Sequence, residues 1–205
     1  MIELARDGGL WTITINRPDK ANSLTPEMLE DLARIATEAS AARVLVITGA
    51  GKVFSAGADL DAAKAGLATS DVWERVSGAI AALPGLTIAA LNGTLAGGAF
   101  GMALACDLRI AVPEANFFYP VMKLGYLPQP SDPGRLAALV GPARAKLILM
   151  GGARLTSDEA LSFGLVDRLV DRDNLAQATQ DLAAHTLAAD AEIAQGIKHL
   201  CQSTS

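Results

Sequence analysis

Residues 44–60 read VLVITGAGKVFSAGADL, and this stretch decides the fold. The continuous apolar run at residues 44–47 is typical of a strand buried on both faces. A glycine-rich stretch follows at residues 49–57, where the backbone can approach a neighbouring group closely. A buried strand that passes through such a turn into a helix indicates a layered α/β protein.

The same unit recurs further along the chain. Residues 86–91 (LTIAAL) are expected to form a strand, and the glycine-rich turn NGTLAGGA follows at residues 92–99. A helix is expected from Gly97 to Cys106, and the next strand at residues 108–112. Repetition of strand, turn and helix predicts consecutive units stacked side by side.

The flanking segments fit this layering. Residues 10–15 alternate between apolar and polar side chains, which predicts a half-buried strand. Thr25-Pro26 is a helix-start signal, and the helical pattern that follows should close near residue 42. A further set of elements is predicted from the pattern of apolar residues: helices at about 70–83, 136–139, 143–150 and 159–163, the last capped by Thr156 or Ser157, a strand at 165–170, and helices over 173–200 interrupted near Asp190.

Composition excludes several classes of protein. The chain has 205 residues, 51% of them hydrophobic, and a net charge of −5, so we expect a globular protein without a nucleic-acid partner. No apolar run is long enough to span a membrane and the first residues lack a leader pattern, so a cytoplasmic protein is expected. The two histidines, His185 and His199, lie near the C-terminus, and no metal site is predicted.

Two apparent nucleotide motifs do not meet their structural requirements. The stretch around Gly51-Lys52 has Val46 where a phosphate-binding loop needs glycine, and Val53 where it needs Ser or Thr. Tyr119 and Lys123 have the spacing of a dehydrogenase pair, but Pro120 argues against the helix that this pair requires. We therefore do not expect a nucleotide site.

The turns at residues 54–60 and 92–99 can both present backbone N–H donors to a bound group. Each leads from a strand into a helix, and a helix N-terminus has N–H donors without an acceptor in the helix. Two such turns facing each other would hold an anionic oxygen between two backbone amides, as in an oxyanion hole. The alternative is that both are ordinary turns in which glycine supplies a positive φ.

These turns also carry a resemblance. The sequence resembles the crotonase (enoyl-CoA hydratase/isomerase) superfamily over residues 2 to about 172. The motifs that match, in order and in spacing, are Asn16-Arg17-Pro18 with Asn22-Ser23-Leu24, Val46-Ile47-Thr48-Gly49 with Phe54-Ser55-Ala56-Gly57-Ala58-Asp59-Leu60, Asn92-Gly93 with Gly97-Gly98, Ala105-Cys106-Asp107-Leu108-Arg109, and Gly164-Leu165-Val166.

The resemblance implies a spiral of ββα units and chemistry that stabilises the enolate of a coenzyme A thioester. The oxyanion donors would be the backbone N–H groups of Ala58 and Gly98. Coenzyme A would enter as part of the substrate, with no separate cofactor. The residues expected to line its site are Lys20, Ala21, Ala56, Ala58, Asp59, Leu60 and Asp61, although Asp59 is better interpreted as a helix-start residue.

The sequence departs from the family pattern at the acid–base positions. Hydratases of the family carry two glutamates, and the corresponding residues are Gly101 and Val121. Other isomerases place an acid where Gln129 stands. Because positioned acid–base groups each contribute about 10²–10⁴-fold, we expect an isomerase-like enzyme rather than an efficient hydratase. The alternative is a catalytically weak acyl-CoA-binding or assembly partner.

Asp132 is the nearest ionisable side chain in the loop that follows. It could serve as the single base of a 1,3-proton shift. The alternative, which Asp-Pro at a helix start favours, is that Asp132 caps a helix beginning at Pro133. Tyr119 and Tyr126 are expected to be hydrogen-bond donors rather than bases, since the pKa of a tyrosine is ordinarily about 10.

The resemblance also divides the chain. Residues 1–172 would form the crotonase-like core domain, and residues 173–205 a shortened C-terminal helical segment. Family members usually continue further, with helices that complete the acyl pocket and pack trimers. We therefore expect a homo-oligomer, a trimer or hexamer, weakened by the short C-terminus.

Overall fold

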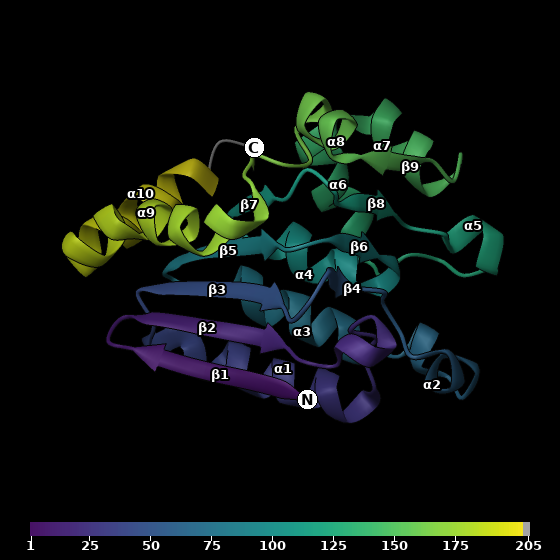
Figure 1. Ribbon diagram of the computed structural model, residues 1–205, viewed down its shortest axis with the longest axis horizontal. Helices are drawn as coiled ribbons and strands as arrows, with labels where there is room; N and C mark the ends of the chain where they lie inside the picture. The colour runs from purple at the N-terminus through teal and green to yellow at the C-terminus, as the bar shows by residue number, and fades with distance from the viewer. Residues whose placement is uncertain (203–205) are drawn as a thin grey trace.

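The computed structural model describes residues 1–202 and contains two β-sheets with helices around them (Figure 1). The larger sheet has the strand order β1 (Ile2–Asp7), β2 (Leu10–Ile15), β3 (Val44–Gly49), β5 (Leu86–Leu91), β7 (Leu108–Ala111) and β10 (Arg168–Leu169). Its strands are parallel except for β1, which pairs antiparallel with β2. The smaller sheet has the order β4 (Val53–Ser55), β6 (Thr94–Ala96), β8 (Asn116–Phe118) and β9 (Arg154–Thr156).

Successive strands alternate between the two sheets. β3, β5 and β7 lie in the larger sheet, and the strands that directly follow them, β4, β6 and β8, lie in the smaller one. A helical segment follows the second strand of each pair. The chain therefore advances as a spiral of ββα units, and the turns that follow β4 and β6 come to neighbouring places because these two strands pair in parallel.

The helices cover both faces of the larger sheet. Helices α1 and α3 pack against each other, α9 contacts β3, β5 and β7, and Figure 1 shows the first two behind the sheet and α9 in front. The α-helices are α1 (Pro26–Glu38), α2 (Leu60–Lys64), α3 (Val72–Ala81), α4 (Phe100–Ala105), α5 (Val121–Leu124), α6 (Asp132–Val140), α7 (Pro142–Leu149), α8 (Ser157–Phe163), α9 (Leu175–Ala188) and α10 (Ala191–Gln202). The shorter 3₁₀ segments are η1 (Pro18–Lys20), η2 (Ala39–Ala41), η3 (Leu67–Thr69), η4 (Gly97–Ala99) and η5 (Arg172–Asn174).

Several predicted elements are confirmed. Strands β2 and β5 have the predicted bounds, and the side chain of Thr25 accepts a hydrogen bond from the amide of Met28 at the start of α1. Thr156 caps α8 in a capping box with Glu159. The predicted interruption near Asp190 separates α9 from α10.

The strand predicted at 165–170 is only β10 (Arg168–Leu169), because Gly164 ends α8 and the amides of Leu165 and Val166 donate to the carbonyl oxygen of Ala160. Two predicted helices have the expected extent but include a 3₁₀ segment. Helix α1 stops at Glu38 and continues as η2 to Ala41, next to the predicted end near residue 42. The helix predicted from Gly97 to Cys106 begins as η4 and continues as α4 to Ala105.

Two basic side chains tie the C-terminal helices to the larger sheet. Arg43, just before β3, donates to the carbonyl oxygens of Thr186 and Ala189. Lys198 on α10 donates to the carbonyl oxygen of Gly85 and pairs with Asp107 at 2.8 Å. Within residues 1–202, no helix has the length and apolar character needed to cross a membrane.

Candidate active site

The first of the two glycine-rich turns leads from β4 to α2 and presents the amide of Ala58. Gly57 has φ of 88°, a value that favours glycine. The turn lies beside the segment before α1: the amide of Leu24 donates to Gly57 O, and the amide of Asp59 donates to Leu24 O. This parallel bridge uses the carbonyl oxygen of Gly57 and the amide of Asp59, one on either side of Ala58, and leaves the N–H of Ala58 outside the pairing.

The second turn leads from β6 to α4 and presents the amide of Gly98. Gly97 has φ of 59°, and Gly98 is the second residue of η4. The first amides of a helix have no acceptor inside it. A Cβ at Gly57 would lie 2.9 Å from Ala96 O and 3.4 Å from Gly98 N, so the two turns are in direct backbone contact. Two neighbouring amides of this kind can donate to one oxygen that carries negative charge.

Two buried asparagines hold the backbone around these turns. The amide nitrogen of Asn22 donates to the carbonyl oxygens of Ala50 and Val53, at 2.9 and 2.6 Å. Asn92 accepts from the amide of Gly49 and donates to Gly51 O and Val53 O. Both side chains therefore cross-link the loop between β3 and β4, which fixes where β4 delivers the first turn.

The residues predicted to line a coenzyme A site lie together. The amide of Ala56 donates to Ala21 O at 3.0 Å, and Ala21 follows Lys20 at the end of η1 with φ of 51°. Leu60 and Asp61 are exposed in the first turn of α2. The structure thus brings the predicted set to one edge of the molecule, next to Ala58.

Asp59 starts a helix, as predicted. Its side chain accepts hydrogen bonds from the amides of Asp61 and Ala62 at the beginning of α2. Its other oxygen pairs with Arg17 at 2.8 Å, and Arg17 also donates to Ser23. The hydrogen bond from Arg17 lowers the pKa of the Asp59 carboxyl, so Asp59 is an ionised structural group.

Asp132 is completely buried, and its carboxyl lies against Gly101 of α4. Oδ2 accepts a hydrogen bond from the hydroxyl of Tyr119 at 2.8 Å, which confirms that Tyr119 is a donor. Oδ1 has no hydrogen-bond partner within residues 1–202. A Cβ at Gly101 would lie 3.0 Å from Oδ1, and Gly101 is three residues after Gly98, one turn further into α4.

The predicted capping role of Asp132 is wrong. Helix α6 begins at Asp132 itself, its N-cap residue is Ser131, and no side-chain hydrogen bond caps it. The carboxyl turns inward to Tyr119 instead of back to the first amides of the helix. Burial is the largest influence on this group and raises the pKa of the Asp132 carboxyl to about 6, although the Tyr119 hydrogen bond opposes the rise.

The two positions at which the resemblance implies glutamates, Gly101 and Val121, carry no carboxylate. Gly101 has no side chain, and the carboxyl of Asp132 lies where a side chain at this position would project. Val121 is the buried first residue of α5, and Gln129 is also buried. A carboxyl group therefore reaches this part of the site from α6 rather than from α4 or α5.

Trp73 is a site residue that sequence reasoning missed. A Cβ at Gly98 would lie 3.2 Å from three ring atoms of Trp73, so the indole covers the Gly98 turn. The ring is buried, and its N–H donates to Leu67 O at 2.8 Å. In the sequence Trp73 is one apolar residue in a helical pattern, and only the packing of α3 against α4 brings it to the turn.

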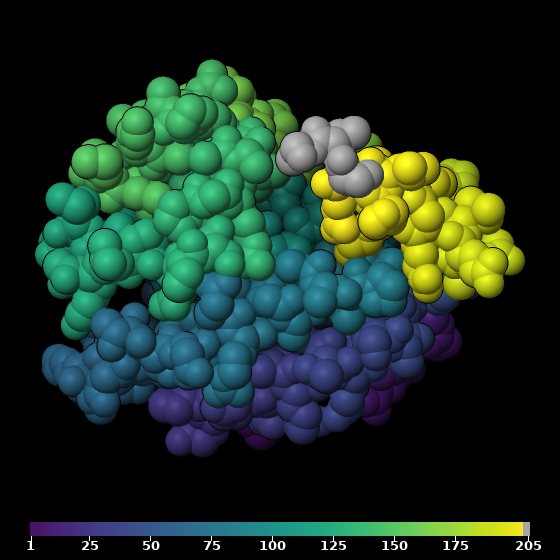
Figure 2. Space-filling view, turned by 180° about the vertical axis from the view of Figure 1, so that it is seen from behind, coloured from purple at the N-terminus to yellow at the C-terminus, as the bar shows by residue number. Residues whose placement is uncertain are grey.

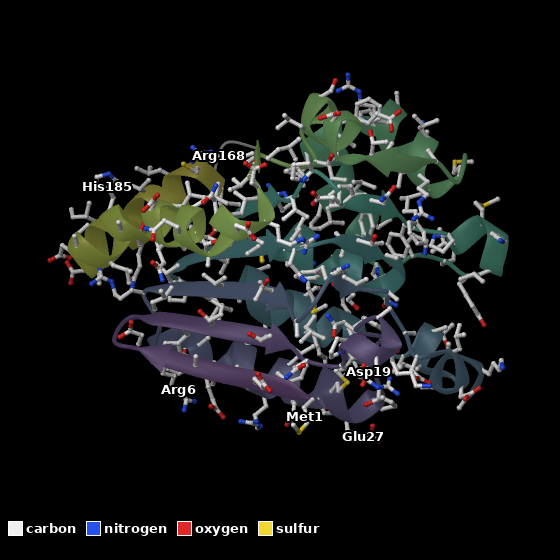
Figure 3. The ribbon with its side chains drawn as sticks, in the orientation of Figure 1. Met1, Arg6, Asp19, Glu27, Arg168 and His185 are labelled. Atoms are coloured by element: carbon white, nitrogen blue, oxygen red, sulfur yellow. The ribbon has the colours of Figure 1, made fainter. Side chains whose placement is uncertain are left out.

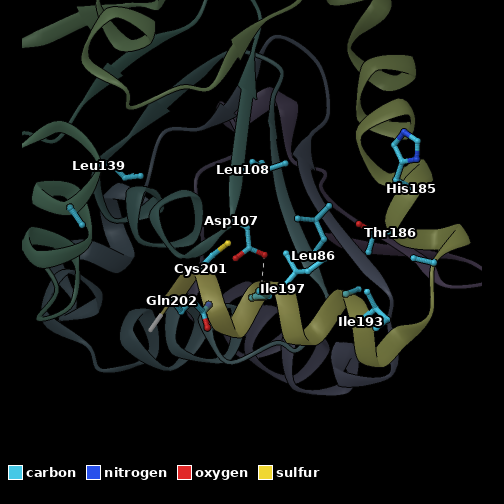
Figure 4. A pocket seen from close by; sticks show the side chains of 14 residues that line it. Leu86, Asp107, Leu108, Leu139, His185, Thr186, Ile193, Ile197, Cys201 and Gln202 are labelled. Carbon is cyan, nitrogen blue, oxygen red and sulfur yellow. Dashed lines mark hydrogen bonds and ion pairs between the residues drawn. The ribbon is translucent and has the colours of Figure 1, made fainter. Parts of the chain in front are cut away.

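A cavity of about 720 Å³ lies elsewhere in the molecule, beneath α10 (Figure 4). Figure 2 shows the hollow between the yellow end of the chain and the green segments. Its walls are mainly apolar and include Leu86, Leu108, Leu139, Ile193 and Ile197. Leu86 and Leu108 are the first residues of β5 and β7, whereas the Gly98 turn lies beyond the last residue of β5, so this cavity is separate from the candidate site.

The histidines also lie outside the candidate site. His185 is on α9 and lines the cavity beneath α10, and Figure 3 shows it at the opposite end of the molecule from Asp19 in η1. His199 is on the exposed helix α10. Among residues 1–202, no group of three or more His, Cys, Asp or Glu side chains could hold a metal ion.

Comparison with known proteins shows which family this chain is similar to. The family model described as enoyl-CoA hydratase/isomerase matches residues 5–205. A 1,2-epoxyphenylacetyl-CoA isomerase of Escherichia coli is 33% identical over 189 residues, which cover 86% of this chain and 72% of that protein.

Solved structures agree with this family. The crystal structure of an enoyl-CoA hydratase from Bacillus anthracis matches with a TM-score of 0.91 and 30% identity, over 98% of this chain and 82% of that one. The structure of an enoyl-CoA hydratase homologue from Thermobifida fusca in complex with CoA matches with a TM-score of 0.88 and 31% identity, over 98% and 84% of the two chains.

Proposed function

Because the chain belongs to the enoyl-CoA hydratase/isomerase family, we propose that it binds an acyl-CoA and moves a proton along the acyl chain. In this proposal it acts as an isomerase rather than as an efficient hydratase. The observation that carries this proposal is the buried carboxyl of Asp132, which has one oxygen without a partner in residues 1–202 and lies one helical turn from the Gly98 amide.

The amides of Ala58 and Gly98 polarise the thioester carbonyl in this proposal. Their two turns are in backbone contact, and neither amide takes part in the bridge or helix beside it. Negative charge develops on the thioester oxygen when the α-carbon loses a proton, and each fixed donor is worth about 3–4 kcal/mol of barrier. The cluster of Lys20, Ala21, Ala56, Asp59, Leu60 and Asp61 at the edge of this site would accommodate the coenzyme A portion, so no separate cofactor is needed.

Asp132 supplies the single base. With a 3-enoyl-CoA, the ionised carboxylate takes a proton from C2, and the electron pair of that C–H bond moves into the dienolate whose oxygen the two amides hold. The protonated carboxyl then returns the proton to C4, and the double bond reforms between C2 and C3. No oxidant or water is consumed, and a pKa of about 6 leaves Asp132 mostly ionised at neutral pH yet able to carry a proton.

Hydration needs more than this site provides. Addition of water requires one group to hold and deprotonate the water and another to deliver a proton to C2. Gly101 and Val121 occupy the two glutamate positions, and Asp132 is one carboxyl. Loss of one positioned acid–base group costs about 10²–10⁴-fold, which disfavours hydration relative to a proton shift.

The test compares two substrates and two variants. We expect the protein to convert a 3-enoyl-CoA to its 2-enoyl isomer at least about 10²-fold faster than it hydrates crotonyl-CoA. Asp132→Asn should lower the isomerisation rate by about 10²–10⁴-fold. Asp71→Asn is the matched control, because the Asp71 side chain is 86% exposed on the surface near α3.

Three results would contradict the proposal. Hydration at an ordinary rate would show that the missing glutamates do not matter. An unchanged isomerisation rate in Asp132→Asn would remove its role as the base. Binding of acyl-CoA with no reaction on either substrate would favour the second candidate, a binding or assembly partner, which the glycine and valine at the glutamate positions support.

We also propose that the chain assembles as a trimer or hexamer, as its family membership suggests. The exposed apolar side chains Ile193 and Ile197 on α10 support an association between copies. Light scattering coupled to size exclusion tests this, and a monomer at micromolar concentration would contradict it.

A further inference from the structure

Tyr119 is held rigidly beside Asp132. It directly follows β8, is 4% exposed, and its ring stacks on Phe100 with the centroids 5.3 Å apart. Phe100 is a fully buried residue at the start of α4, the helix that also carries Gly101. The phenol is therefore fixed by both the smaller sheet and the helix of the candidate site.

The hydrogen bonds of this phenol make the two oxygens of Asp132 unequal. Tyr119 Oη donates to Oδ2 at 2.8 Å, and the amide of Gln129 approaches the same phenol oxygen at 3.5 Å. Oδ1 is left without a partner in the described chain and lies 3.0 Å from where a Cβ at Gly101 would stand. A catalytic role is one explanation for a buried oxygen that no protein group satisfies.

We propose that Tyr119 is a positioning residue, which holds Oδ2 so that Oδ1 is the atom that takes and returns the proton. This inference rests on the proposed isomerisation and adds the atom that performs it. Without the phenol, the carboxyl could rotate about its Cβ–Cγ bond and present either oxygen at a poorer angle to the acyl chain. Displacement of a reacting group by about 1 Å can cost 10²-fold in rate.

Two charged side chains, Glu74 and Arg135, also act on the carboxyl of Asp132. Glu74 comes from α3 and binds the amide and hydroxyl of Ser131, and Arg135 comes from the next turn of α6. Burial and Glu74 raise the pKa of Asp132, whereas the Tyr119 hydrogen bond and Arg135 lower it. Loss of the phenol hydroxyl should therefore raise the pKa of Asp132 further.

The first test is Tyr119→Phe, which keeps the ring against Phe100 and removes the hydroxyl. We expect kcat to fall by about 10- to 100-fold with KM unchanged, and the acidic limb of the pH–rate profile to move to higher pH. Tyr126→Phe is the matched control, because Tyr126 is the other tyrosine of the chain and is 39% exposed. An unchanged kcat and an unmoved acidic limb in Tyr119→Phe would overturn the proposal.

The second test does not require catalytic turnover, and it does not require that a Tyr119 variant folds. Replacement of both tyrosines by 3-fluorotyrosine places two ¹⁹F labels in the protein. We expect the Tyr119 resonance to shift with pH around the titration of Asp132, and this shift to be lost in Asp132→Asn. A Tyr119 resonance that is flat between pH 4.5 and 7.5, or a shift that persists in Asp132→Asn, would overturn the inference. Titration without any isomerisation would contradict the proposed reaction but support the coupling of Tyr119 to Asp132.

Discussion

At the scale of single residues, the site depends on one buried carboxyl and on what surrounds it. Asp132 is enclosed by Tyr119, Gly101 and the turn of α6, and water cannot solvate its charge there. Desolvation disfavours the ionised form, which is why the pKa of Asp132 rises to about 6. This burial therefore makes the folded state less stable once the group ionises.

The pH dependence of stability tests this residue directly. Because the pKa of Asp132 is raised in the folded state above its unfolded value of 3.8, the folded protein binds more protons between these values, and stability falls as pH rises through about 4 to 6. Asp132→Asn removes this loss. We expect the difference in unfolding free energy between Asp132→Asn and the parent to shift by about 2 kcal/mol in favour of the variant from pH 4 to pH 7.

Urea unfolding at several pH values measures this difference. Comparison of the two proteins at each pH cancels the titration of their shared groups. A difference that stays constant from pH 4 to pH 7 would show that the Asp132 carboxyl is not desolvated. Asp71→Asn, which removes a carboxyl that is 86% exposed, is the control.

The sequence alone could identify Asp132 but not decide its role. Asp-Pro before an apolar helical pattern favours a cap over a base, but local pattern does not specify which way a side chain turns. The direction of the Asp132 side chain is set by its hydrogen bond with the hydroxyl of Tyr119, a residue thirteen positions away in the sequence. A pattern of neighbouring residues cannot show such a contact. Trp73 was missed for the same reason, since its contact with Gly98 joins distant segments.

At the scale of elements, the site is the meeting of two strand-to-helix turns. β4 and β6 pair in parallel, so their turns leave the smaller sheet at adjacent points. Gly57 allows the turns to touch, because it has no Cβ and adopts a positive φ. The distance between the Ala58 and Gly98 amides is therefore sensitive to this one position.

Gly57→Ala tests the contact between the turns. A Cβ would lie 2.9 Å from Ala96 O, so the turns must separate, and we expect a rate loss of about 10²-fold or more with the fold retained. Gly152→Ala is the control: Gly152 also has a positive φ, of 67°, but a Cβ there would meet nothing within 4 Å. Equal activities in the two variants, measured by the isomerase assay, would contradict a role for this close approach.

Gly101→Ala tests the space that Asp132 occupies. A Cβ would lie 3.0 Å from Asp132 Oδ1 and would push the carboxyl away from its position, so we expect a loss of at least about tenfold in rate. Gly78→Ala, at a helical glycine with nothing within 4 Å, should keep full activity and gain about 0.5–1 kcal/mol of stability. Circular dichroism and thermal unfolding separate the two effects, and full activity in Gly101→Ala would count against the placement of Oδ1.

The central strands of the larger sheet, β2, β3, β5 and β7, could be predicted from the sequence, whereas its edge strand β1 and the strands of the smaller sheet could not. β2 and β5 have six residues each, enough for an apolar pattern to be recognised. β4 and β6 have three residues each and lie inside glycine-rich stretches that are typical of turns. Their pairing creates the site, yet it becomes visible only when the spiral places them side by side.

At the scale of the whole molecule, the spiral separates the candidate active site from the mainly apolar cavity beneath α10. The candidate site lies beyond the ends of β4 and β6, and the cavity beneath α10 lies at the starts of β5 and β7. Family membership agrees with the resemblance found in the sequence, and with the predicted spiral of ββα units. The reaction could not be predicted from the sequence, because Gly101 and Val121 stand where the resemblance implies glutamates, and Asp132, which we propose as the base, begins another helix.

The central claim is that two backbone amides and Asp132 together labilise the C2 proton of a bound acyl-CoA. Exchange of this proton with deuterium in D₂O, followed by NMR for a 3-enoyl-CoA, measures that step most directly. We predict enzyme-dependent exchange at C2 in the parent protein and a rate lower by about 10²–10⁴-fold in Asp132→Asn. Tight binding of the acyl-CoA with no exchange at C2 in the parent protein, or equal exchange in Asp132→Asn, would contradict the claim.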